Sequence, residues 1–179
     1  MDENYNYFGG RGATCPTRKH LDHRGPAYVH IDGAWYFITI NAAERVDLTC
    51  RSTPAGPLMP FASKILDSAR YYHNIGKWRL ALLLVMPDHL HLLVHVPAVD
   101  GAAALPKIIA AWKHYLSSHL GLNLQRDFFD TRMRDDEMYR EKFVYICQNP
   151  VRWGLVKSAR DWPHVIAFSR EDGTERVHR

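Results

Sequence analysis

Two histidines, His89 and His91, have the residue type and the spacing to hold a metal ion. They follow an apolar run and a turn at Pro87-Asp88, and apolar residues alternate with them. Because side chains alternate between the two faces of a strand, both histidines point the same way, with Cα atoms about 6–7 Å apart. Two imidazoles on one strand face can share a divalent metal and leave coordination positions open, which suits catalysis.

A second pair, Tyr115 and His119, lies on an expected helix. Residues four apart share a helix face, and both stand at the edge of the helix's apolar stripe, so we expect them to lean toward the sheet. If this helix packs beside the histidine strand, His119 is a candidate third metal ligand and Tyr115 is a phenol next to the metal. That combination suggests attack at phosphorus, with a covalent phosphotyrosine as the intermediate.

The elements that position these residues follow from apolar periodicity. Strands are expected at 35–40, 78–86, 89–96 and 128–133, and helices at 60–75, 105–120 and from Asp135 through Ile146, with Asn149-Pro150 ending the third. The core order is βαββαβ. We therefore predict an α+β fold of the ferredoxin-like or RRM-like kind, an antiparallel sheet with helices packed on one face.

Composition narrows the function classes. The 179 residues, 46% of them apolar, fit one domain with a full core. We expect a flexible basic arm at 1–25, the domain at 26–168 and a polar tail at 169–179. The net charge of +4 permits an acidic partner such as nucleic acid without requiring one.

Compartment and cofactor expectations come from what the sequence lacks. Three scattered cysteines without a CxxC pair indicate a reducing, cytoplasmic location. The N-terminus has no signal-peptide pattern, and no apolar run approaches the ~20 residues of a membrane span. Without such a run we expect no membrane partner. The sequence also has neither a P-loop nor a GxGxxG motif, so we expect no nucleotide cofactor.

Several blocks resemble one known family. Residues 86–93 resemble the HUH motif (U for a bulky apolar residue) of single-tyrosine transposases. Residues 112–115 are similar to the nucleophile segment of REP-associated tyrosine transposases, which act on repetitive extragenic palindromes. Residues 128–135 and 161–163 resemble further parts of that family, and 145–156 resemble its YIxxNPVxxGLV block. The likeness spans about residues 26–168 and implies the HUH endonuclease fold.

The resemblance implies a metal-dependent endonuclease and strand transferase acting on single-stranded, hairpin-forming DNA through a 5′-phosphotyrosine. It implies that His89 and His91 bind Mg²⁺ or Mn²⁺, that Tyr115 is the nucleophile and that His119 completes the metal site. Asp88 stands where many relatives have asparagine, which puts a carboxylate near the metal. A short link after the second helix favours a monomer, with a dimer as the alternative.

Other residues are candidates for DNA contacts, and other functions stay open. The basic candidates for phosphate contact are Arg11, Arg18, Lys19, Arg24, Lys113, His114, Arg132 and Arg134. One alternative is a hairpin-binding protein without catalysis. Another is a histidine-triad nucleotide hydrolase. That family requires a third histidine two residues after the second, where this chain has Leu93.

Overall fold

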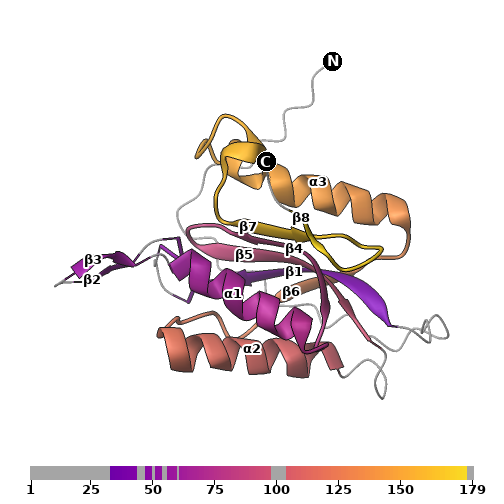
Figure 1. Ribbon diagram of the computed structural model, residues 1–179, viewed down its shortest axis with the longest axis horizontal. Helices are drawn as coiled ribbons and strands as arrows, with labels where there is room; N and C mark the ends of the chain where they lie inside the picture. The colour runs from indigo at the N-terminus through magenta and orange to yellow at the C-terminus, as the bar shows by residue number, and fades with distance from the viewer. Residues whose placement is uncertain are drawn as a thin grey trace.

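A six-stranded antiparallel sheet forms the centre of the computed structural model, which describes residues 33–43, 47–49, 51–53, 56–59, 61–97 and 104–176 (Figure 1). Its strands are β1 (Ala34–Asn41), β4 (Arg79–Val85), β5 (His89–Val96), β6 (Phe129–Arg132), β7 (Val165–Phe168) and β8 (Glu175–Arg176). Their spatial order is β6-β1-β5-β4-β7-β8. The long strands β1 and β5 pair from Ala34↔Val96 to Asn41↔His89. A separate hairpin joins β2 (Arg51–Thr53) and β3 (Gly56–Met59).

The described residues also form three α-helices, α1 (Phe61–Asn74), α2 (Ala104–Leu120) and α3 (Asp136–Arg152), and a short 3-10 turn η1 (Ala159–Asp161). The order β1-α1-β4-β5-α2-β6 is the predicted βαββαβ unit, and its strands lie in the order β6-β1-β5-β4. The predicted α+β class and antiparallel sheet are confirmed.

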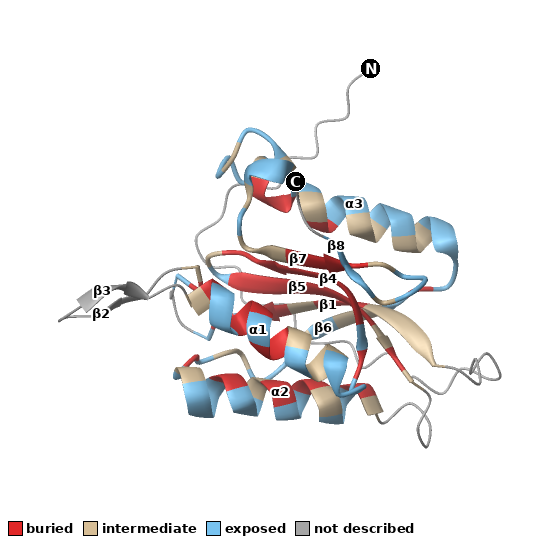
Figure 2. Cartoon of the chain, in the orientation of Figure 1, coloured by how far each residue is buried: buried red, intermediate tan, exposed pale blue. Residues whose placement is uncertain are grey.

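The helices lie on both faces of the sheet. α1 and α2 pack on one face, where Ile65 and Trp112 meet Leu90 and Leu92 of β5. α3 packs on the other face, where Ile146 belongs to a second core. Figure 2 shows the resulting layers, with buried strands between helices whose outward-facing surfaces are exposed. The expectation of helices on one face holds for α1 and α2 but is wrong for α3, because β4 is apolar on both sides and both faces of β5 are largely buried.

α3 runs farther than its proline predicts. Asp135 caps its start by accepting a hydrogen bond from the Met138 N–H at 2.8 Å. The expected end at Asn149-Pro150 is wrong, since the helix continues to Arg152 and contains Pro150. It ends in a Schellman motif at Gly154, whose φ of 69° is left-handed. There the Leu155 N–H donates to the Pro150 carbonyl at 2.9 Å. Asn149 is therefore helical and faces the sheet.

The C-terminal segment extends the sheet. β7 pairs with β4, and β8 pairs with β7 through Ala167↔Arg176. β8 falls within the predicted polar tail, so the sheet continues beyond the domain limit expected at residue 168.

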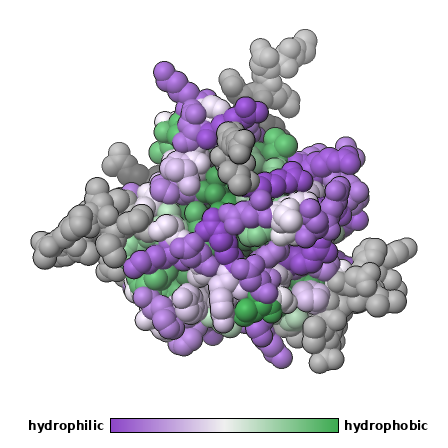
Figure 3. All heavy atoms as spheres, in the orientation of Figure 1, coloured by the Kyte–Doolittle hydropathy of each residue, from purple (hydrophilic) through white to green (hydrophobic). Residues whose placement is uncertain are grey.

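The predicted arm, residues 1–25, lies outside the described residues. Within the described part of the chain, each helix is too short or too polar to span a bilayer. The face shown in Figure 3 is largely hydrophilic, with separated apolar patches.

Candidate metal and nucleophile site

His89 and His91 share one face of β5, as their spacing predicted. Their Nε2 atoms lie 3.1 Å apart, and only 8% and 4% of the two residues is exposed. Leu90 points the opposite way, into the core beneath α1 and α2. β5 lies between β1 and β4, so a well-paired inner strand holds both imidazoles. Two nitrogen donors therefore converge from one rigid element.

The Nδ1 atom of each imidazole ring has its own partner. The Asp88 carboxylate lies 2.6 Å from His89 Nδ1, and the Thr39 hydroxyl lies 2.9 Å from His91 Nδ1. A carboxylate only accepts, so His89 carries its proton on Nδ1, and the neutral ring has its lone pair on Nε2. Asp88 thus orients a ring from behind, as the outer partners of metal-binding histidines do.

Burial keeps His91 neutral. Burial, with smaller effects from His89 and Lys142, lowers the pKa of His91 from 6.5 to about 3. The neutral imidazole is the form that binds a metal, because the protonated ring has no lone pair to donate.

α3 supplies a third polar group. The Asn149 side chain is buried, and its Nδ2 lies 2.8 Å from His91 Nε2. Its Oδ1 is also buried and has no hydrogen-bond partner among the described residues. Such an oxygen costs roughly 1–3 kcal/mol when left unsatisfied. Imidazole nitrogens and an amide oxygen are ligands that Mn²⁺ and, with more oxygen or water, Mg²⁺ accept, so the donor set fits a divalent cation.

A phenol lies beside these groups. Tyr145 stands one helical turn before Asn149, and its ring centroid lies 5.8 Å from that of His91. The residue is 37% exposed, so incoming substrate can reach it. Two cations flank the ring, with Lys142 Nζ at 5.5 Å and the Arg152 guanidinium carbon at 5.1 Å from its centroid. A partly exposed tyrosine with two cations near its ring suits a phosphate substrate.

Tyr115 and His119 lie elsewhere. Their rings stack on each other at 4.3 Å on α2, and His119 Nδ1 lies 3.2 Å from the Tyr115 carbonyl. α2 covers the sheet face opposite α3, so the expectation that this pair faces the histidines is wrong. The physical reason is strand alternation: Leu90 and Leu92 face α2, while the histidines face α3.

Comparison with known proteins supports the family resemblance. No protein-family model matches the chain. Over 153 residues, 78% of this chain and 82% of the relative, it is 26% identical to a Haemophilus influenzae protein named "Putative REP-associated tyrosine transposase". The resemblance to REP-associated tyrosine transposases is confirmed. The solved structure of such a transposase bound to a REP hairpin has the same fold, with a TM-score of 0.57 and 22% identity over 79% of this chain and 81% of that chain.

The pair that the structure brings to the histidines was missed from sequence. Tyr145 and Asn149 have the same four-residue spacing as Tyr115 and His119, and they lie inside the segment that resembles the transposase YIxxNPVxxGLV block. That repeated spacing was the available signal. Sequence periodicity gave no means of choosing between the two helices, because it does not report which sheet face a helix covers.

The predicted DNA contacts divide into three groups. Arg11, Arg18, Lys19 and Arg24 lie outside the described residues. Lys113 donates to the carbonyls of Gln125 at 2.5 Å and Arg126 at 2.6 Å, and burial lowers its pKa. Its ammonium thus anchors the link after α2, instead of being free for the expected phosphate contact. His114 is exposed on α2, on the sheet face away from the histidine pair.

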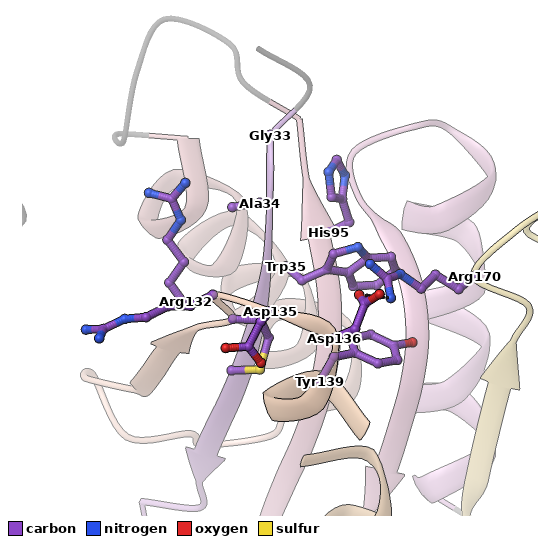
Figure 4. Close-up of a pocket in the computed structure, with 11 residues that line it drawn as sticks. Gly33, Ala34, Trp35, His95, Arg132, Asp135, Asp136, Tyr139 and Arg170 are labelled. Atoms are coloured by element: carbon purple, nitrogen blue, oxygen red, sulfur yellow. Dashed lines mark hydrogen bonds and ion pairs between the residues drawn. The ribbon is translucent and has the colours of Figure 1, made fainter. Parts of the chain in front are cut away.

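Arg132 and Arg134 line a cavity of about 310 Å³ near the start of α3 (Figure 4). Arg170 lies over the rings of Trp35, at 5.6 Å, and Tyr139, at 4.7 Å. Arg170 also pairs with Asp136 at 2.6 Å and lowers the pKa of that carboxyl. These contacts fasten the N-terminal end of α3 to the sheet, while Tyr145 and Asn149 lie toward its other end.

Proposed function

We propose that the protein is a transposase-like enzyme that cleaves and rejoins single-stranded, hairpin-forming DNA, with Tyr145 as its nucleophile. The observation that carries the proposal is the meeting of Tyr145 and Asn149 on α3 with the histidine pair on β5. The likeness to a REP-associated tyrosine transposase supports the reaction class. The sequence-based choice of Tyr115 is replaced because α2 covers the opposite face.

His89, His91 and Asn149 would hold the divalent cation, Mg²⁺ or Mn²⁺. When bound there, the cation would supply Lewis-acid stabilisation of negative charge on the phosphate. Asp88 and Thr39 keep the imidazoles oriented, so the two rings would need little rearrangement when the cation binds.

The chemical step is a transesterification. The Tyr145 oxygen attacks phosphorus and forms a new P–O bond, and the bond from phosphorus to the 3′ oxygen breaks. The phenol gives up its proton, and the leaving oxygen gains one to become a free 3′-OH. The 5′ phosphate remains joined to the tyrosine. Attack by another 3′-OH reverses the step and joins two strands without an external energy source.

The positive side chains contribute electrostatically. Lys142 and Arg152 lie near the Tyr145 ring, where they can attract the phosphate and stabilise charge developing on it. Both reach the ring from α3 itself, so one helix carries the nucleophile, an amide ligand and two cations.

The test compares two tyrosines. A labelled single-stranded palindrome from beside the gene is incubated with Mn²⁺ or with EDTA, and products are resolved on a denaturing protein gel. We expect a metal-dependent covalent band from wild type and from Tyr115→Phe, and at least a thousandfold less from Tyr145→Phe, since phenylalanine lacks the attacking oxygen.

The opposite pattern, with the band lost in Tyr115→Phe and kept in Tyr145→Phe, would overturn the assignment. Hairpin binding without a covalent band from wild type would instead favour a DNA-binding protein without catalysis. Thermal melting of both variants serves as the folding control.

A further inference from the structure

Two large aromatic side chains are left exposed beside the candidate site. Trp153 is 52% exposed and Phe129 is 63% exposed, although aromatic rings generally contribute to a protein's core. The other tryptophans are buried or half-buried. Packing in the protein core therefore does not account for either of these two rings.

Trp153 lies against the histidine pair. It is the C-cap residue that follows α3, and its ring centroid is 5.8 Å from that of His89. The Schellman motif at Gly154 fixes the backbone here. The indole thus has a defined place next to His89 and a large open surface.

Phe129 lies on the same sheet face, on the edge strand β6. It pairs with Thr39, which in turn pairs with His91, so the three side chains form one cross-strand row. Phe129 is two strands away from His91, and the two backbones are therefore about 10 Å apart. Its neighbour Phe128 packs into the core beneath α2, so Phe129 must point toward the α3 face.

We propose that Trp153 and Phe129 are stacking platforms for unpaired nucleobases on the two sides of the scissile phosphate. Every base has an aromatic face, so stacking holds a single strand without reading its sequence. Lys142 and Arg152 lie near Tyr145, where they can contact the phosphates between the stacked bases. The position of the scissile phosphate rests on the proposed function, whereas the stacking itself does not.

Binding is measured apart from cleavage. The full chain carrying Tyr145→Phe is titrated in EDTA against a fluorescent DNA hairpin with an unpaired 5′ extension. We expect Trp153→Ala and Phe129→Ala each to weaken binding roughly five- to a hundredfold, as the loss of one base–aromatic stack predicts. Trp153→Phe should retain most of the affinity. Tyr71→Ala, an equally exposed aromatic on α1, should change nothing.

A scan of abasic positions then locates each stack. Removing the base that sits on Trp153 should weaken binding to the parent protein but not further weaken binding to Trp153→Ala, and a different nucleotide should behave this way toward Phe129→Ala. Affinities within twofold of the parent for both alanine variants would overturn the proposal, as would losses that match those of Tyr71→Ala.

Failure here is distinguishable from failure of the proposed function. A wild-type covalent band together with unchanged binding by both alanine variants removes the stacking platforms and leaves the enzyme. Stacking-dependent binding without any covalent band removes the chemistry and supports the platforms.

Discussion

At the scale of single residues, the candidate site depends on the groups that contact the Nδ1 atoms of its two histidines. Asp88 and Thr39 each contact an Nδ1 atom, so the two Nε2 atoms point at a common place. The sequence analysis expected the Asp88 carboxylate near the metal. In the structure the carboxylate contacts His89 Nδ1, so the imidazole ring separates it from His89 Nε2. Its effect on a metal held by Nε2 would therefore pass through His89.

Asp88→Ala should reduce Mn²⁺ affinity about 10- to 100-fold, because His89 loses the acceptor that fixes its tautomer and ring orientation. Isothermal titration calorimetry with Mn²⁺ measures this without any DNA. Asp88→Asn is the matched control, since its side-chain carbonyl can still accept from Nδ1, and it should lose much less. Equal affinities for all three proteins would show that Asp88 does not support the ring.

At the scale of elements, the sequence predicted most of the sheet, but it identified the histidine pair of the candidate site without the side chains from α3 that lie beside it. Apolar alternation is local, so the histidine strand and the βαββαβ order were readable from it. Whether α2 or α3 covers the histidine face depends on how the chain folds back after β6, which no local pattern encodes. Pro150 added to the difficulty, because an internal proline normally ends a helix, whereas here the helix runs on to Arg152.

Asp135→Ala should destabilise the fold by about 1 kcal/mol, since the α3 N-terminus loses the side-chain acceptor for the Met138 N–H. Urea unfolding followed by circular dichroism gives the free energy of unfolding. Glu141→Ala, an exposed position in the middle of the same helix, is the comparison and should change stability by less than about 0.5 kcal/mol. A loss in Glu141→Ala as large as that in Asp135→Ala would argue against the cap.

At the scale of the whole molecule, both halves of the candidate site come from one chain. α3 packs on the sheet that contains β5, so Tyr145 meets His91 without a second copy. The expectation of a monomer remains a prediction, and this arrangement is what a working monomer requires.

Mixing two inactive variants, Tyr145→Phe and His91→Ala, should therefore restore no covalent band, since neither chain contains a complete site. The denaturing-gel assay with the labelled palindrome measures this, and wild type diluted to the same active-site concentration is the positive control. Recovery of about a quarter or more of the wild-type band would mean that α3 is exchanged between chains.

The division of the candidate ligands between β5 and α3 links ion binding to global stability. The histidines belong to the centre of the sheet, but Asn149 reaches them only when α3 is docked. An ion bridging the two elements would bind the folded chain and not the unfolded one, so by mass action it would raise the free energy of unfolding by about 2.7 kcal/mol at a hundred times its dissociation constant. The cation would then act as a reversible cross-link, and melting temperature would report divalent-ion concentration even without DNA.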